Sequence, residues 1–211
     1  IRVLSFEEAA ELSYFGAKVL HPSTVLPAIR RSIPVHIYNT HNPSCEGTLI
    51  VPQPKQSRNT IKSIAFKREV TVMNVSSTRM IAAHGFLREI FAVFDRHNTS
   101  VDVVTTSEAS ISVTLDNAQR VDEIKHDLGA IGEVRVEPNK AIVCVVGDNL
   151  KFTPGVAARL FQSLKDININ MISQGASEIN VTFVINDNEI ERAVRLLHDD
   201  FFRECDEAVF A

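Results

Sequence analysis

The chain contains two copies of one sequence pattern, and this duplication constrains its fold more than any single motif. The copies align without a gap at an offset of 70 positions, and they share a glycine, a phenylalanine, an asparagine and a Ser-Glu pair. The matched residues are Gly85 with Gly155, Phe91 with Phe161, Asn98 with Asn168, and Ser107-Glu108 with Ser177-Glu178. Such self-similarity indicates a repeated supersecondary unit. We therefore expect two copies of one α+β unit behind a different leading segment.

Each copy shows the element order β-α-β-β-α-β, which is typical of a ferredoxin-like sandwich. For the first copy, the apolar spacing and the turn residues predict a strand at 70–75, a helix at 85–97, strands at 100–105 and 109–115, a helix at 117–128 that Gly129 ends, and a strand at 134–136. For the second copy, they predict a strand at 141–146, a helix at 154–165 with Thr153 as its N-cap, strands at 169–173 and 180–185, and a helix at 187–198.

The second copy lacks a clear last strand, because residues 199–211 are acidic and only weakly strand-like over 207–210. Residues 61–66 alternate in the manner of a strand, but they precede the first copy and have no place in it. A unit without one of its strands would leave an open sheet edge. We therefore expect residues 61–66 to complete the second unit, so that the first unit is inserted into the second.

The leading residues 1–51 differ from both copies. Ser5 and Glu8 have the spacing of a capping box for a helix through Tyr14. Further patterns in this segment predict a helix at 24–31 and a strand at 33–38. The polar, proline-containing run at 53–59, which follows the leading segment, indicates a linker. Lys18 lies near a helix end, where it is either a solvated lysine or a cation that faces a phosphate. Its position alone leaves both readings open.

Composition and motif spacing disfavour several classes of protein. The net charge of −4 is wrong for a nucleic-acid surface, and the strands lack the aromatic signature of an RNA-binding βαββαβ domain. The seven histidines show no metal-binding spacing, and neither a nucleophile elbow nor a Walker loop is present. The three cysteines lie far apart, which indicates reduced thiols in a cytoplasmic compartment. No apolar run approaches the ~20 residues of a membrane span.

Asp102 is out of place in its β-branched run, because a carboxylate on an inward face is costly unless it is paired. Gly85 lets a ligand approach the backbone closely, and the amides of Phe86 and Leu87 would be free at a helix start, where a carboxylate is favoured. Together these residues describe a site for an amino acid with a basic side chain. The alternative, in which Gly85 is only a turn and Asp102 only an edge acid, fits the spacing at least as well. The second copy has Ile172 in place of Asp102, which suggests one ligand site and one structural copy.

Three long motifs resemble the aspartate kinase family, in the order in which they occur there. Phe15–Arg30 (FGAKVLHPSTVLPAIR) is similar to the end of the catalytic domain, His84–Asp116 resembles the first ACT domain of the lysine-sensitive type, and Gly155–Ile185 resembles the second ACT domain. The resemblance extends to about Phe202. It implies an α/β amino-acid kinase domain followed by two ACT domains, the first inserted into the second.

The resemblance also implies a division of the chain and an effector site. The implied parts are the end of the kinase domain at 1–51, a linker at 52–60, the first ACT domain at 69–138, the second at 61–68 and 139–202, and a tail at 203–211. Asp102 would hold the ε-ammonium of L-lysine, and the amides at the start of the helix would take its α-carboxylate. The implied effector-binding residues are Met80, Ala83, Gly85, Phe86, Leu87, Ser100, Val101, Asp102, Thr106, Ser107 and Glu108. Lys18 would contact the nucleotide phosphates, Glu11 matches an acid near the interface between the catalytic and regulatory parts, and Ala83 departs from a serine of some relatives.

The activity implied by the resemblance is that of a longer parent protein. The parent would phosphorylate L-aspartate with ATP and Mg at the first step of lysine, threonine and methionine biosynthesis. The family's phosphate loop and aspartate-binding residues are absent and the chain begins at Ile1, so we expect a piece without kinase activity and without catalytic residues, metal or cofactor. We expect a cytoplasmic homodimer, joined through its ACT units, that binds neither nucleic acid nor membrane. An ACT module for another effector such as threonine, and a bifunctional parent, are the alternatives.

Overall fold

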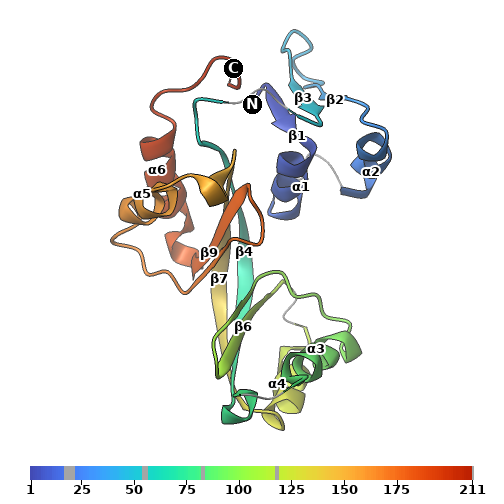
Figure 1. Ribbon diagram of the computed structural model, residues 1–211, viewed down its shortest axis with the longest axis vertical. Coiled ribbons are helices and arrows are strands. Elements are labelled where there is room, and N and C mark those ends of the chain that lie inside the picture. The colour runs from blue at the N-terminus through green and yellow to red at the C-terminus, as the bar shows by residue number, and fades with distance from the viewer. Residues whose placement is uncertain (17–21, 54–56, 82–83, 117–118, 211) are drawn as a thin grey trace.

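The structure is a computed structural model that describes residues 1–16, 22–53, 57–81, 84–116 and 119–210. Two long strands, β4 (Ile61–Ser76) and β7 (Glu133–Gly147), run antiparallel along the length of the molecule (Figure 1). The first half of β4 pairs with the second half of β7, from Ile61 with Gly147 to Lys67 with Ile142. This pairing confirms that the strand before the first unit completes the second unit.

The first unit is built on one end of the two long strands. It contains β5 (Val104–Thr106), β6 (Ser110–Leu115), the 3-10 turn η1 (Thr78–Met80), α3 (Phe86–Arg96) and α4 (Val121–Gly129). Its strands lie in the order β5-β6-β4-β7, and α3 and α4 cover one face (Figure 1). The buried apolar face of α3 and the strand residues facing it form one core, as the helical spacing predicts.

The second unit repeats this arrangement at the other end of β4 and β7. It contains β8 (Met171–Gln174), β9 (Asn180–Asn186), α5 (Val156–Ser163) and α6 (Ile190–Phe201), with the 3-10 turns η2 (Leu150–Phe152) and η3 (Asp187–Glu189). All six strands form one antiparallel sheet in the order β5-β6-β4-β7-β9-β8. The fold is therefore two ferredoxin-like units, the first inserted into the second.

Several predicted boundaries were wrong, for identifiable reasons. Helix α5 begins at Val156 with Gly155 in the left-handed conformation as its N-cap, so Thr153 is not the cap. Helix α4 begins at Val121, four residues later than predicted, and its last residue is Gly129, within one residue of the predicted end. The strand expected at 100–105 is shorter, since β5 covers only 104–106 and Asp102 precedes it. Residues 207–210 form turns and no strand.

The leading segment forms a small layer of its own. It contains β1 (Val3–Ser5), α1 (Phe6–Tyr14), α2 (Pro22–Arg30), β2 (Val35–Ile37) and β3 (Thr48–Val51). The strands form a three-stranded sheet in the order β1-β3-β2, of which the sequence pattern indicated only β2. The capping box of α1 is confirmed, because Ser5 Oγ accepts from the Glu8 amide at 3.0 Å and Glu8 Oε2 accepts from the Ser5 amide at 2.7 Å.

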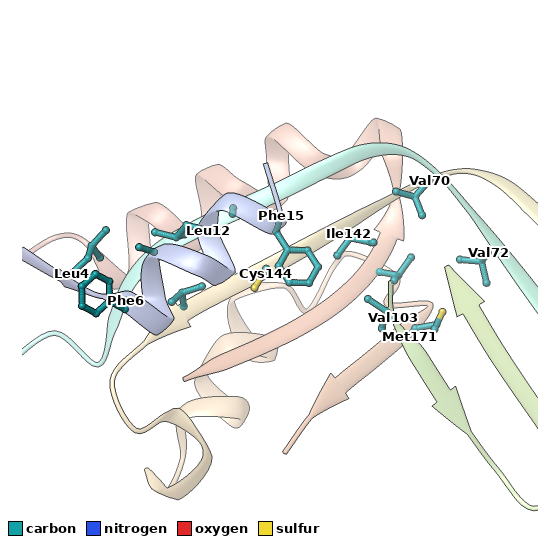
Figure 2. Packing of buried hydrophobic residues seen from close by; sticks show 14 of the residues in the cluster. Leu4, Phe6, Leu12, Phe15, Val70, Val72, Val103, Ile142, Cys144 and Met171 are labelled. Atoms are coloured by element: carbon teal, nitrogen blue, oxygen red, sulfur yellow. The ribbon is translucent and has the colours of Figure 1, made fainter. Parts of the chain in front are cut away.

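Helix α1 covers the face of the sheet that α5 and α6 leave open. Residues 141–146 of β7 are fully buried on both faces. Ala141, Val143 and Val145 face the core under α5 and α6, whereas Ile142, Cys144 and Val146 belong to the core that includes Leu12 of α1 and Phe15, which follows the helix. Figure 2 shows Phe15 beside Cys144 and Ile142. A strand that is covered on both sides has a continuous apolar sequence, and β7 needs α1 as its second cover.

Candidate functional site

Asp102 lies at the junction of the first unit and α1. Its backbone amide donates to the Thr114 carbonyl at 3.2 Å, and the next amide, of Val103, donates to Thr114 Oγ1 at 2.8 Å. These bonds fix the segment before β5 against the end of β6. The Asp102 side chain is only 3% exposed, so the position is inward-facing, as its sequence context predicts.

The carboxylate of Asp102 is paired by groups of this chain. The Tyr14 hydroxyl donates a hydrogen bond to Oδ1, and Lys67 Nζ lies 3.2 Å from Oδ2. Lys67 Nζ also contacts the carboxylate of Asp116 and lies 5.3 Å from the centre of the Tyr14 ring. The sequence predicted that Asp102 needs a cationic partner, but it gave no sign that Lys67 and Tyr14 fill that role, because they lie 35 and 88 residues away.

The two carboxylates of this cluster differ in their affinity for a proton. Burial raises the pKa of Asp116, and its hydrogen bond with Asp102 raises it further, although Lys67 acts in the opposite direction. Burial also acts to raise the pKa of Asp102, but hydrogen bonds with Asp116 and Tyr14 and the charge of Lys67 bring it below its usual value. Burial and the Asp102 carboxylate raise the pKa of Tyr14 far above its usual range, so its hydroxyl remains a donor. Of the two carboxyl groups, Asp102 therefore loses its proton at the lower pH.

The start of α3 has the geometry of an anion site. Gly85 has a φ of 82°, in the left-handed region that favours glycine, and helix α3 begins immediately after it. The first amides of a helix have no partner within the helix, so those of Phe86 and Leu87 are placed to receive a carboxylate. The Phe86 side chain is buried in the core of the unit, whereas Leu87 is 40% exposed. Gly155 repeats this geometry before α5, with a φ of 82°.

The predicted effector-binding residues fall into two groups within one chain. The Ser77 amide donates to the Ala109 carbonyl, which places η1, with Met80, beside the exposed turn of Thr106, Ser107 and Glu108. Asp102, with Ser100 and Val101 before it, lies at the Thr114 end of β6. Four strand residues separate the two ends, which corresponds to about 14 Å, and α3 spans a similar length of about 16 Å between them. Ala83 and Lys18 lie outside the described residues.

A cavity of about 660 Å³ lies between α1 and the turn that precedes β9. Glu7, Glu11 and Tyr14 line it from α1, and Ser177-Glu178 lines it from the turn. This Ser-Glu pair is the second copy of the one at 107–108, so the duplicated turn of the second unit faces the leading segment. Ile172, the counterpart of Asp102, is 45% exposed. Glu11 therefore lies between α1 and the duplicated turn of the second unit.

Two classes of site receive no support in the described part of the chain. Among residues 1–16, 22–53, 57–81, 84–116 and 119–210, histidine, cysteine and carboxylate side chains form no group of three that could hold a metal ion. No helix within these ranges has both the length and the apolar character to cross a bilayer.

Comparisons with known proteins agree with this geometry. A family model of the ACT domain matches residues 143–201. The chain is 41% identical to "Aspartokinase 1, chloroplastic" of Arabidopsis thaliana over 96% of its length, and it spans 37% of that protein. It matches the crystal structure of E. coli aspartokinase III in complex with lysine and aspartate with a TM-score of 0.83 and 37% identity, over 96% of this chain and 46% of that one. A putative C-terminal regulatory domain of aspartate kinase from Porphyromonas gingivalis W83 is 32% identical, with a TM-score of 0.62, over 69% of this chain and all of that one.

Proposed function

The chain belongs to the aspartokinase family, and we propose that it is the regulatory part of an aspartate kinase and senses L-lysine. The observation that carries the proposal is the match over 96% of the chain to an aspartokinase III captured with lysine. The parent enzyme would phosphorylate L-aspartate with ATP and Mg at the first step of lysine, threonine and methionine biosynthesis. Lys18 would contact the nucleotide phosphates in that parent.

The division of the chain follows from the same proposal. Residues 1–51 would be the end of the catalytic domain, 52–60 a linker, 69–138 the first ACT domain, 61–68 with 139–202 the second, and 203–211 a tail. A catalytic centre for phosphoryl transfer needs groups that cradle and neutralise the phosphates, and these residues supply none of the family's phosphate loop. We expect no turnover of ATP and aspartate by the 211-residue chain, and measurable turnover would contradict this assignment.

The two separated groups of effector-binding residues support a dimer. L-lysine has five bonds between Cα and Nζ, and at about 1.5 Å each they span at most about 8 Å. This Cα-to-Nζ span is shorter than the ~14 Å between the two ends of β6 within a chain, which favours a site made of one group from each of two chains. Strand β5 lies at the edge of the sheet, where backbone groups are available for another strand. A twofold copy set against this edge would bring Asp102 of one chain towards Gly85, Phe86 and Leu87 of the other.

Lysine is favoured over threonine as the effector because of Asp102. An ionised carboxylate pairs with the ε-ammonium of lysine, and threonine carries no second cation. Inhibition would then be a population shift, in which lysine binds one arrangement of the ACT units more tightly. The free cysteines Cys45, Cys144 and Cys205 support a reducing compartment, and we place the protein in the cytoplasm.

The thermal stability of variants tests this proposal. A ligand that binds the native state raises the midpoint of unfolding, so lysine should raise it for the wild-type chain and threonine should not. Asp102→Asn removes the charge with little change in shape and should abolish the response to lysine. Asp166→Asn removes an exposed carboxylate from the second unit and should leave the response intact. An unchanged lysine response in Asp102→Asn would refute the role of Asp102, and a threonine response alone would favour the other effector.

A further inference from the structure

The carboxylate that is proposed to bind the effector is already occupied in this structure. Tyr14 holds one oxygen of Asp102 and Lys67 holds the other, and 3% exposure leaves almost no surface for a ligand to contact. The Nζ of Lys67 is a primary ammonium on a flexible four-carbon stem, which is the same group that a lysine effector would present. An effector ammonium and Lys67 therefore compete for one carboxylate.

We propose that Lys67 and Tyr14 act as an internal latch on Asp102, and that the ammonium of the effector displaces them when it binds. The inference rests on the proposed function, because it assumes that Asp102 receives the ε-ammonium of L-lysine. The ammonium groups of Lys67 and of the effector, together with the Tyr14 hydroxyl, then compete for the Asp102 carboxylate. Binding of the effector requires the contacts of Lys67 and Tyr14 with Asp102 to open. The apparent affinity for lysine is the intrinsic affinity multiplied by the fraction of chains in which Asp102 is not latched.

The surroundings of Lys67 make this exchange feasible. Lys67 also contacts Asp116, whose side chain is 40% exposed, so its ammonium keeps one carboxylate partner when it leaves Asp102. It lies where the pairing of β4 with β7 changes register, two residues before Glu69, whose φ is 59°. This irregularity marks the boundary between the two halves of β4. The Lys67 side chain therefore lies between the two units, and a change in its conformation takes place outside both cores.

Tyr14 extends the consequence to the leading segment. It is the last residue of α1, and the body of that helix is fixed to β4 by the buried pair of Glu8 with Lys62. Opening the Tyr14–Asp102 bond therefore removes one tie between α1 and the first unit, while Phe15 and the Glu8–Lys62 pair keep the helix packed on the sheet. Lys18, which the proposed function assigns to the nucleotide phosphates, follows Tyr14 by four residues in the sequence. The Tyr14 contact thus joins the proposed effector site to the end of α1, four residues before Lys18 in the sequence.

The binding constant of a latch variant tests the displacement. Lys67→Met removes the competing ammonium and should tighten the binding of L-lysine about tenfold, which is the scale of one hydrogen bond to a charged group. Arg68→Met removes the neighbouring cation, which pairs with Asp187 and Glu191, and it should leave the affinity unchanged. If the wild-type chain binds lysine but Lys67→Met binds equally or more weakly, the displacement is overturned and the proposed function stands. A wild-type chain that binds no lysine refutes both.

A second measurement leaves the latch itself unmodified. The chain has two tyrosines and no tryptophan, so Tyr38→Phe makes Tyr14 the sole source of tyrosine emission. Tyr38 is exposed and stacks only on His36 among the ring contacts of the described residues. A hydrogen bond from a tyrosine hydroxyl to a carboxylate quenches its emission, so saturating lysine should increase the Tyr14 signal and threonine should not. Saturated lysine binding without any change in emission would overturn the release of Tyr14.

Discussion

Asp102 is held by side chains from three separate segments of the chain. Tyr14 comes from α1, Lys67 from β4, and Asp116 from the residues after β6. A carboxylate whose partners come from distant segments forms its contacts only in the folded state. The ionisation of Asp102 is therefore linked to folding.

This linkage predicts a pH dependence that Asp102→Asn should remove. The folded-state pKa of Asp102 lies below its ordinary value of 3.8, so its ionised form stabilises the native state. The contribution is present above pH 3.8 and is lost as the pH falls through the lower, folded-state value. Urea unfolding of both proteins from neutral pH to about pH 3 should show their free energies of unfolding converging in acid. A constant difference across this range would contradict the shift.

Comparing the same substitution at Gly85 and at Gly155 tells whether Gly85 serves only as a turn or also contacts the ligand. Gly85 and Gly155 both have a φ of 82°, and an added Cβ meets at most the flexible Arg88 side chain, at 3.9 Å from Gly85. Gly85→Ala and Gly155→Ala should therefore each cost about 1–2 kcal/mol of stability from backbone strain alone. Only Gly85→Ala should also weaken lysine binding, as calorimetry can measure. Equal lysine affinity in both variants would show that Gly85 is only a turn.

Sequence reasoning identified Asp102 at the residue scale but not its partners. An acid within a β-branched run is a local contradiction, and a local contradiction is visible in a sequence. The partners Tyr14 and Lys67 meet it only through the packing of α1 on the sheet, for which no spacing rule exists. The two starting glycines were found because the duplication aligned them.

At the scale of elements, α1 and β4 are joined by a buried ion pair. Lys62 Nζ lies 2.6 Å from Glu8 Oε1, and the two side chains are 1% and 3% exposed. The other oxygen of Glu8 caps its own helix through the Ser5 amide. One carboxylate thus both begins α1 and fixes it to the sheet.

Removing one partner of this pair should be costlier than removing both charges. Lys62→Met leaves the carboxylate of Glu8 buried without its cation, which should destabilise the chain by about 3–5 kcal/mol. Adding Glu8→Gln removes that charge and keeps an oxygen for the cap, so the double variant should recover much of the loss. Urea unfolding of the four proteins gives the coupling energy. Simple additivity of the two single changes would contradict a coupled pair.

The continuity of β4 and β7 was the main feature of the elements that sequence patterns missed. Polar residues interrupt the apolar pattern near Glu69 and Asn139, and each interruption predicts the end of a strand. Both residues have a positive φ, of 59° and 57°, and the strands continue through them. The reason is tertiary, because each strand passes from one unit into the other. The residues before and after each irregular position are paired, and the strand therefore continues although Glu69 and Asn139 themselves are not paired between β4 and β7.

At the scale of the whole molecule, the two units share β4 and β7 and therefore do not fold as separate bodies. The leading segment shares a core with both units, since Phe15, Val72 and Ile142 belong to one cluster (Figure 2). A ligand that binds one unit thus acts on a continuous sheet and on the helix that covers it. The inserted order of the units could be inferred from a missing strand, whereas the docking of α1 on the sheet could not.

Isothermal titration of L-lysine into the purified chain tests the central claim most directly, with L-threonine as the control and light scattering on the same sample. The account predicts a dimer, saturable heat with lysine and none with threonine. A folded dimer that gives no heat with lysine, or equal heat with both amino acids, would contradict the assignment of this chain as a lysine sensor.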